Sequence, residues 1–247
     1  MRRQGRPSSV RRAESGPAAV SGRPPGSLTP DELEGTLLRA ATALDVALPG
    51  GFAAQVGTYL DELERWQRIG NLTAYQDQAA RVRHLVLESL MMLAVLPESA
   101  SPLLDIGTGP GVPGLILKLA RPEWEVVLVE AARRRVNFLR HVVRCLGLQG
   151  VSVDWGRAEA LGAGPLGGHF RTVTMRAVAR GNAARKLAAP FLAPDGALVL
   201  AVGPRVASTP GNRQERVISP PGELPWRRQF LIIQRTELDA DVSRGTA

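Results

Sequence analysis

The sequence is poor in cysteine, since Cys145 is the only one in 247 residues. A single thiol excludes an internal disulfide and a cysteine-based zinc site, and it indicates a reducing compartment. Lysine is nearly as scarce, because Lys118 and Lys186 are the only lysines among 31 basic residues. Such an arginine excess partly follows from the base composition of a genome. The net charge of +8 therefore does not by itself indicate a nucleic-acid partner.

Long apolar runs are also missing. No segment reaches the roughly 18 apolar residues of a membrane span, and the arginine-rich start is followed by no apolar core of a secretory signal. Residues 1–27 hold six arginines and one glutamate, together with many prolines, glycines and serines. We expect residues 1–27 to be a disordered basic tail in a cytoplasmic protein without membrane contact. The alternative is an arm that touches RNA phosphates.

Apolar residues at helical spacing fill the chain from residue 28 to residue 97. Thr29 followed by Pro30 and two acidic residues is the start signal of a first helix. A second helix is predicted over residues 52–69 and a third over residues 79–96. We therefore expect an N-terminal helical region over residues 28–97.

From residue 101 onward, short apolar runs alternate with helical stretches. The predicted strands are 103–106, 126–129, 151–153, 173–175 and 197–202, and the predicted helices between them are 112–120, 133–148 and 183–192. This rhythm is typical of an α/β fold with a parallel sheet covered on both faces. A last strand is predicted over residues 227–236. We expect one domain over residues 98–237 and a loose C-terminus over residues 238–247.

The most informative stretch is LLDIGTGPGVPG, at residues 103–114. An apolar strand runs into Asp105, and four glycines then precede a helical stretch: Gly107, Gly109, Gly111 and Gly114. Glycines at this junction let the backbone adopt positive φ and approach a ligand closely. The N-terminus of the following helix offers unpaired N–H groups. The pattern predicts a nucleotide-type cofactor site.

The glycine pattern of this turn is compatible with two kinds of cofactor, a dinucleotide and S-adenosylmethionine. The last three glycines match G-x-G-x-x-G, the fingerprint of dinucleotide sites. However, the carboxylate of Asp105 would repel a diphosphate, and Pro110 and Pro113 remove two N–H donors from the turn. Asp-x-Gly-x-Gly-x-Gly is instead the first motif of class I S-adenosylmethionine methyltransferases. That cofactor carries an ammonium and a sulfonium group and no phosphate.

A second acidic residue, Glu130, ends the next apolar run. It lies about 20 residues past the turn, where a carboxylate accepts the ribose hydroxyls of an adenosine. Dehydrogenases use the same arrangement, so Glu130 predicts an adenosine site without deciding between the cofactors. The alternative is an ordinary carboxylate at a strand end.

Further strings accompany the glycine turn DIGTGPGVPG: GNLTA at 70–74, RHLVLES at 83–89, RRVNFLRHV at 134–142, RAE at 157–159 and MRAVA at 175–179. Together they resemble the bacterial 16S ribosomal RNA guanine-N7 methyltransferases, methyltransferase G, also called glucose-inhibited division protein B. The resemblance implies a class I S-adenosylmethionine methyltransferase fold, which is Rossmann-like, with an N-terminal helical extension. The chain departs from the family pattern at Met175, where serine is usual, and at Val202, where lysine is expected.

The resemblance also implies roles for individual residues. Glu130 would hold the ribose, Ala158 and Glu159 would meet the adenine, and Arg176 would lie at the mouth of the site. The residues expected to bind S-adenosylmethionine are Asp105, Gly107, Gly109, Gly111, Val112, Glu130, Ala158, Glu159 and Arg176. Arg176, Arg83 and His84 are expected to be the catalytic residues. The alternatives are a structural histidine at position 84 and a surface ion pair at position 176.

Signatures of other base methylations are absent. The sequence contains no Asn/Asp-Pro-Pro-Tyr/Phe string, which enzymes that methylate amino nitrogens use. Methylation of a pyrimidine carbon needs a cysteine nucleophile, but Cys145 lies in the middle of a predicted helix, away from any strand end. Guanine N7 has a free lone pair, so its methylation needs alignment and no general base. We expect a monomer that methylates N7 of a guanine in 16S ribosomal RNA, free or in a small-subunit particle, without a metal ion. The alternatives are a methyltransferase of this fold with another substrate and a non-catalytic RNA-binding relative.

Overall fold

The computed structural model describes residues 27–162, 164–176, 181–202, 215–218, 228–236 and 238. Of the predicted N-terminal tail only Ser27 falls within these ranges, and of the predicted loose C-terminus only Leu238, so both expectations lie outside the described residues. Within the described part, no helix combines the length and the hydrophobicity that crossing a bilayer requires.

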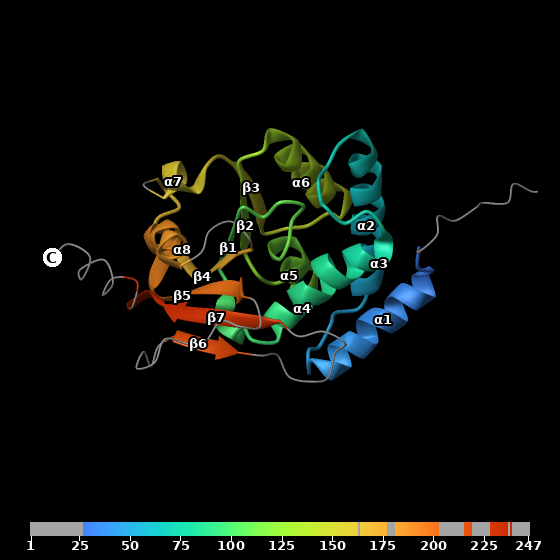
Figure 1. The fold of residues 1–247 in the computed structure, drawn as a ribbon, viewed down its shortest axis with the longest axis horizontal. Helices are drawn as coiled ribbons and strands as arrows, with labels where there is room; N and C mark the ends of the chain where they lie inside the picture. Colours follow the sequence, from blue (N-terminus) through green and yellow to red (C-terminus); the bar gives the residue numbers. More distant parts are fainter. Residues whose placement is uncertain are drawn as a thin grey trace, which may run out of the picture.

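The core of the fold is one sheet in the order β3-β2-β1-β4-β5-β7-β6 (Figure 1). Its strands are β1 Leu103–Ile106, β2 Val126–Glu130, β3 Val151–Trp155, β4 Phe170–Met175, β5 Leu192–Val202, β6 Glu215–Ile218 and β7 Gln229–Gln234. The first five strands pair in parallel, whereas β7 is antiparallel to β5 and to β6. All four residues of β1 are buried, as expected for a central parallel strand. The predicted class I methyltransferase fold is confirmed by this order and by the antiparallel last strand.

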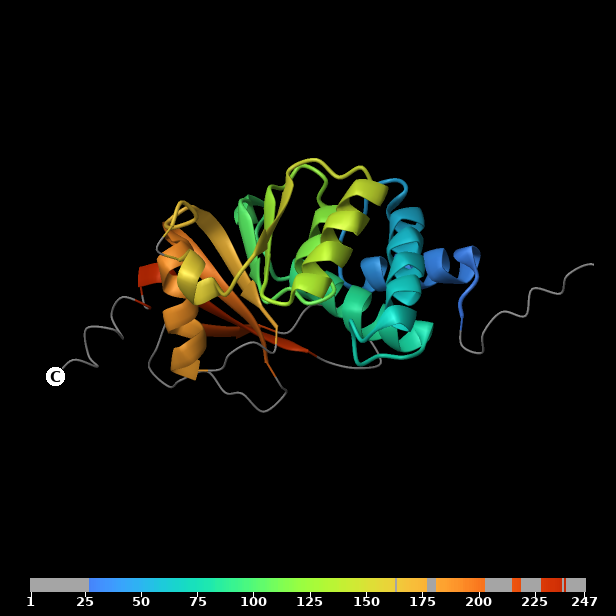
Figure 2. The ribbon, with the colours of Figure 1, turned by 90° about the horizontal axis from the view of Figure 1, so that it is seen from above.

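Helices cover both faces of the sheet (Figure 2). On one face α5 Gly114–Ala120 and α6 Arg133–Cys145 lie between the sheet and the N-terminal helices, and on the other face lies α8 Gly181–Ala188. Neighbouring residues of β1 serve opposite faces, because Leu103 joins the first apolar cluster and Leu104 the second. Alternation along one strand thus builds two cores.

The N-terminal helices belong to the larger of these cores. The first is α1 Pro30–Ala43, whose Thr29 and Glu32 form the capping box that the start signal suggested. The second is α2 Phe52–Ile69, with the predicted bounds. Because their apolar residues share one cluster with α5 and the sheet, this helical region packs against the sheet domain. The domain boundaries themselves stay predictions.

The predicted helix over residues 79–96 is divided into three parts. It consists of α3 Gln78–Arg81, a π-helical stretch η1 Val82–Leu87 and α4 Glu88–Leu93. Asp77 caps the start, its Oδ1 accepting from the Ala80 N–H at 2.7 Å. A π turn holds more residues than an α turn and rotates everything after it, which a search for a 3.6-residue period cannot detect.

Several other boundaries differ from the sequence expectation, since β3 ends later, β4 and β5 begin earlier, α5 begins later and α6 ends earlier than predicted. The helix predicted over residues 183–192 is α8 followed by a 3₁₀ turn, Ala189–Phe191, and Leu192 already opens β5. Pro190 explains the early end, since it has no N–H for a helical hydrogen bond. Strand β6 and the short helix α7 Ala158–Leu161 were not predicted at all.

Candidate active site

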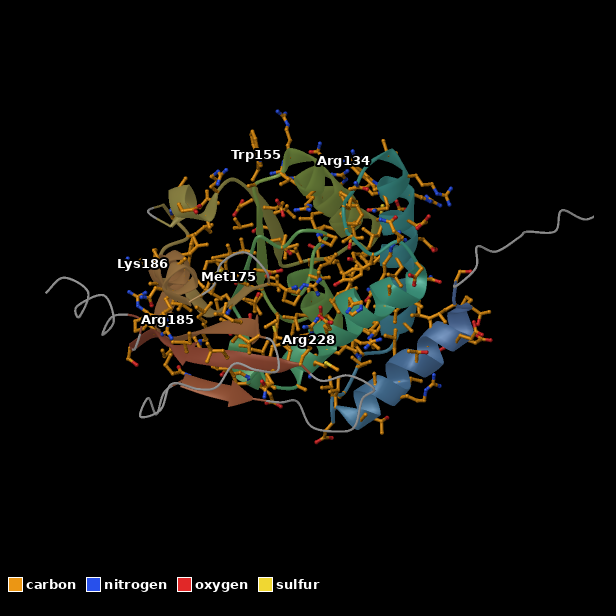
Figure 3. The ribbon with its side chains drawn as sticks, viewed as in Figure 1. Arg134, Trp155, Met175, Arg185, Lys186 and Arg228 are labelled. Carbon is orange, nitrogen blue, oxygen red and sulfur yellow. The ribbon has the colours of Figure 1, made fainter. Side chains whose placement is uncertain are left out.

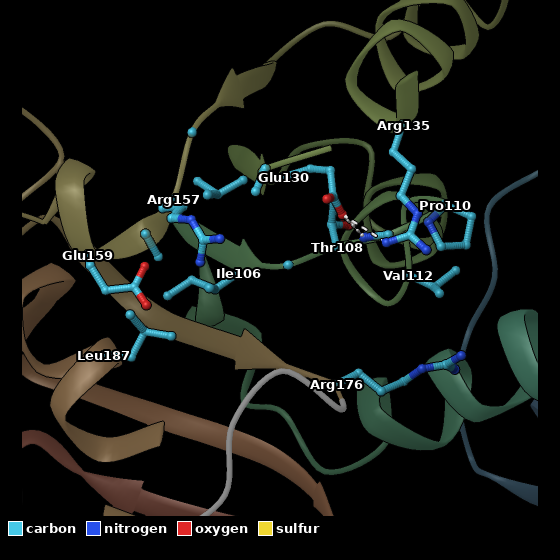
Figure 4. Close-up of a pocket in the computed structure, with 16 residues that line it drawn as sticks. Ile106, Thr108, Pro110, Val112, Glu130, Arg135, Arg157, Glu159, Arg176 and Leu187 are labelled. Atoms are coloured by element: carbon cyan, nitrogen blue, oxygen red, sulfur yellow. Dashed lines mark hydrogen bonds and ion pairs between the residues drawn. The ribbon is translucent and has the colours of Figure 1, made fainter. Parts of the chain in front are cut away.

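A cavity of about 490 Å³ opens at the carboxyl ends of the central strands (Figure 4). The sheet order places β1 between β2 and β4, so successive connections leave β1 in opposite directions and leave a crevice there. The residues that line it are Ile106, Gly107, Thr108, Gly109, Pro110, Val112, Val129, Glu130, Ala131, Arg135, Gly156, Arg157, Ala158, Glu159, Arg176 and Leu187. Seven of the residues expected from the sequence to bind the cofactor therefore surround one space.

The glycine turn forms the floor of this cavity. Gly107 and Gly109 have φ values of 66° and 61°, a region that favours glycine strongly. The Gly107 N–H donates to the Val129 carbonyl at 2.8 Å, which continues the pairing of β1 with β2 past the end of the strand. The turn is also fixed from outside, because the Tyr59 hydroxyl of α2 donates to the Pro110 carbonyl at 3.1 Å. An N-terminal helix thus holds the turn in place.

Asp105 lies inside the protein rather than on the cavity wall. Its side chain is fully buried, and one oxygen accepts from the Thr108 hydroxyl at 2.6 Å and from the Gly114 N–H at 2.9 Å. The other oxygen accepts from the Thr174 hydroxyl at 2.9 Å. Burial raises the pKa of Asp105 to about 6, while these hydrogen bonds oppose the rise. The geometry differs from the expectation of a direct contact, since the carboxylate joins β1, the turn, α5 and β4.

Two of the glycines serve packing. A Cβ on Gly114 would lie 2.5 Å from Leu128 Cδ2 and 2.8 Å from Asp105 Cβ, so α5 approaches the sheet as closely as glycine allows. A Cβ on Gly111 would lie 3.0 Å from Leu139 Cδ2, and this residue does not line the cavity. Gly107, Gly109 and Gly111 are expected at the ligand, but of these only Gly107 and Gly109 border the space.

Glu130 ends β2 with its carboxylate at the cavity. The side chain is almost buried, and it accepts from the Gly109 N–H at 2.9 Å and from the Ala132 N–H at 2.8 Å. Arg135 approaches the same carboxylate at 3.8 Å. A carboxylate has about four acceptor positions, so Glu130 retains capacity for two further donors.

The far end of the cavity is formed where β3 ends. The Gly156 N–H donates to the Glu130 carbonyl at 3.1 Å, which keeps this loop beside β2. The following residues Arg157, Ala158 and Glu159 all line the cavity, with Ala158 buried and the other two exposed. This end therefore combines an apolar surface with hydrogen-bonding groups.

The opposite end holds a cluster of charges around Glu88 on α4. Arg176, which follows β4, donates to the His84 carbonyl and lies 3.6 Å from Glu88. Glu88 also accepts from Arg228 at 2.8 Å and contacts His84 Nδ1 at 2.8 Å. Its side chain is only 7% exposed, so the two partly exposed guanidinium groups offset the charge of a nearly buried carboxylate. The ring of His84 stacks on Tyr75, with centroids 4.6 Å apart.

Of the three residues expected on the catalytic side, only Arg176 lines the cavity. His84 and Arg83 lie on η1, beside this cluster, with His84 partly buried and Arg83 exposed. Sequence reasoning missed the part played by Glu88 and Arg228. The four-residue spacing of His84 and Glu88 was a usable signal, whereas nothing in the sequence connects Glu88 to Arg228. Figure 3 shows Arg228 beside α4.

No group of three or more His, Cys, Asp or Glu side chains in the described part of the chain is arranged to hold a metal ion.

The chain is similar to known proteins in sequence and in structure. Residues 53–219 match the family named GidB and described as rRNA small subunit methyltransferase G. The ribosomal RNA small subunit methyltransferase G of Sorangium cellulosum is 42% identical over 180 residues, which are 72% of this chain and 74% of that protein. The protein of the same name from Chloroflexus aggregans is 38% identical over 171 residues, 69% of this chain and 72% of that protein. Among solved structures, a SAM dependent methyltransferase from Aquifex aeolicus has a TM-score of 0.46 at 17% identity, over 69% of this chain and 96% of that chain.

Proposed function

The chain belongs to the rRNA small subunit methyltransferase G family, and on that premise we propose that it transfers the methyl group of S-adenosylmethionine to N7 of a guanine in 16S ribosomal RNA. The observation that carries the proposal is the cavity at the glycine turn, where Glu130 and Arg176 face one space from two strand ends. Its volume of about 490 Å³ falls within the range of roughly 300–1,000 Å³ of small-molecule sites.

The residues at the cavity fit this cofactor part by part. Glu130 has acceptor capacity left for the two ribose hydroxyls, after its contacts with the Gly109 and Ala132 N–H groups. The apolar wall at Ala158 and the carboxylate of Glu159 suit the face and the amino group of adenine. Gly107 and Val112 border the space next to the turn, where the amino-acid end would lie. We propose that Asp105 acts indirectly, by holding the turn in shape.

The chemistry needs alignment more than proton transfer. When bound, S-adenosylmethionine supplies a methyl group activated by a sulfonium. The N7 lone pair forms the new bond to carbon while the carbon–sulfur bond breaks, and its electron pair stays on sulfur. No proton leaves the guanine, so a site with no general base is sufficient. The positive charge moves from sulfur to the base during the transfer.

The charge cluster at the mouth fixes the position of Arg176. Arg176 is held by the His84 carbonyl and by Glu88, and Glu88 supplies negative charge in a nearly buried position. We propose that Arg176 contacts the incoming guanine or the cofactor's carboxylate, and that His84 and Arg83 act on the substrate side. A guanidinium that is fixed before the substrate binds can align the base without reorganisation during the reaction.

The test is methyl transfer by the purified protein. Labelled S-adenosylmethionine is supplied with naked 16S ribosomal RNA, with 30S particles and with an unrelated RNA, and the product nucleosides are separated. We expect 7-methylguanosine from the ribosomal substrates and none from the unrelated RNA, with activity lost in Arg176→Ala. Transfer to a small molecule or a protein instead would support the first alternative, and RNA binding without transfer would support the second. Size-exclusion chromatography and cell fractionation test the accompanying proposals of a monomer and of the cytoplasm.

A further inference from the structure

Helix α6 begins with three consecutive arginines, Arg133 to Arg135, and its first turn contains no acidic residue. Its N-cap, Ala132, provides no side-chain hydrogen bond. The N-terminus of a helix carries partial positive charge, so cations there lower stability and carboxylates raise it. The three arginines in this turn therefore lower the stability of their own helix.

The three guanidinium groups contact three different partners. Arg135 lines the cavity and approaches Glu130. Arg134 is directed to α2, where it donates to the Trp66 carbonyl at 3.3 Å. Arg133 lies over the indole ring of Trp155, with its guanidinium carbon 5.2 Å from the ring centroid. Only the last of these contacts joins two exposed side chains.

Trp155 is the last residue of β3, and 55% of it is exposed. Its Nε1–H donates to the Ala131 carbonyl at 3.0 Å, so the ring is fixed at its polar edge while much of its surface faces solvent. The exposed part of this ring offers a flat surface on which a planar group can stack. Figure 3 shows Trp155 projecting from the edge of the molecule, with Arg134 at the nearby start of α6.

This pair of side chains borders the candidate active site. Ala131, which accepts from the indole, and Gly156, which follows Trp155, both line the cavity. The exposed Arg157 lies next along the chain and lines it as well. A ligand that extends out of the cavity at this end would therefore meet an aromatic ring and two guanidinium groups.

We propose that Arg133 and Trp155 form a platform for the substrate RNA, on which an unpaired base next to the target guanine stacks. This inference rests on the proposed function. Single-stranded RNA presents flat bases and phosphates together, and it is recognised by stacking on aromatic rings and by arginine contacts with the backbone. The indole supplies the stacking surface on the face opposite Arg133. Arg133 and Arg157 supply positive charge for adjacent phosphates.

The experiment compares four variants with the wild-type protein in steady-state methyl transfer to 30S particles and in binding to naked 16S ribosomal RNA. Trp155→Ala removes the ring, and Trp155→Phe keeps a smaller one. Arg133→Glu reverses the charge at the first turn of α6. Arg144→Glu is the matched control, because Arg144 is an exposed arginine in the last turn of the same helix.

We expect Trp155→Ala to raise the KM for RNA about tenfold, the order of one lost base–aromatic stack, and Trp155→Phe to restore most of that loss. Arg133→Glu should raise this KM and lower the salt slope of RNA binding by about one. Its thermal midpoint should equal or exceed that of the wild type, because a carboxylate is favoured at this end of the helix. Arg144→Glu should leave the KM within about twofold. Affinity for S-adenosylmethionine should be unchanged in all four variants.

Wild-type KM and RNA affinity in both Trp155→Ala and Arg133→Glu would overturn the platform while leaving the proposed function intact. An effect on 30S particles without one on naked RNA would also overturn it, since the surface would then contact ribosomal protein. If the wild-type protein transfers no methyl group, the proposed function fails on its own. The affinities of the variants for naked RNA would still decide on the platform.

Discussion

Glu88 on α4 accepts a hydrogen bond from Arg228 at 2.8 Å, across 140 residues of sequence. This contact joins the N-terminal helices to the residue that precedes β7, at the mouth of the candidate active site. Glu88 also lies 3.6 Å from Arg176, so one nearly buried carboxylate holds two guanidinium groups in place. The last strand and the N-terminal extension thereby build the site together.

Replacing Glu88 should separate positioning from binding. We expect Glu88→Gln to lower kcat at least tenfold and to reduce the free energy of unfolding by about 1–3 kcal/mol, because Arg176 and Arg228 lose their charged partner. The KD for S-adenosylmethionine distinguishes the two proposed contacts of Arg176: it stays near the wild-type value if Arg176 contacts the guanine, and it rises if Arg176 contacts the cofactor's carboxylate. Glu88→Asp, which keeps the negative charge, is the conservative control and should retain most activity. Equal kcat in Glu88→Gln and wild type would contradict a positioning role.

Asp105 should produce a pH-dependent stability of definite sign. Its pKa in the folded protein is raised to about 6 from 3.8, so the folded state binds its proton more tightly than the unfolded state does. The stability that this group contributes is present below about pH 4 and is lost as the pH rises through about 6, a change on the order of 2–3 kcal/mol. Chemical denaturation of the wild type and of Asp105→Asn at pH 4 to 7 measures it. The difference in unfolding free energy should shift in favour of Asp105→Asn with rising pH, and a constant difference would refute this account.

Glu130 is predicted to hold the ribose of the cofactor. Glu130→Ala leaves hydroxyl donors unpaired, so we expect S-adenosylmethionine to bind more weakly by about 1–3 kcal/mol. Isothermal titration calorimetry measures this, with Glu123→Ala as control, since Glu123 is an exposed carboxylate elsewhere in the chain. An unchanged dissociation constant in a folded Glu130→Ala protein would mean that the ribose is held by other groups.

Gly114 tests the packing of α5 on the sheet. A methyl group there would lie 2.5 Å from Leu128 Cδ2 and 2.8 Å from Asp105 Cβ, so we expect Gly114→Ala to cost about 1–3 kcal/mol of stability. At Gly50 an added Cβ meets nothing within 4 Å, and Gly50→Ala should be nearly neutral. Thermal unfolding of the two variants compares them. Equal midpoints would show that α5 can move away without cost.

Much of the fold could be predicted because its apolar runs are long and well bounded. Strand β1 and helix α2 have the predicted bounds, since buried strands and amphipathic helices leave strong periodic patterns. The π-helical stretch Val82–Leu87 could not be predicted, because a single sequence carries no signal for one extra residue in a turn. Strand β6 has four residues and α7 has four, too few for any periodicity.

The candidate site was predictable where chemistry follows local sequence. The glycine turn follows β1 and Glu130 ends β2, so the parallel sheet brings them to one edge. The position of Asp105 was harder to foresee, because its partners Thr108 and Thr174 occupy its oxygens and turn it into the interior. The role of Glu88 depends on Arg228, which only the folded chain brings near. The assignment of individual residues to cofactor and substrate stays a prediction.

The measurement that tests the central claim most directly is the mapping of 7-methylguanosine in 16S ribosomal RNA from cells with and without this gene. We expect one guanine to lose its N7 methyl group when the gene is deleted. The methyl group should return with the wild-type gene but not with one encoding Arg176→Ala. An unchanged set of N7-methylated guanines in the deletion strain would contradict the account.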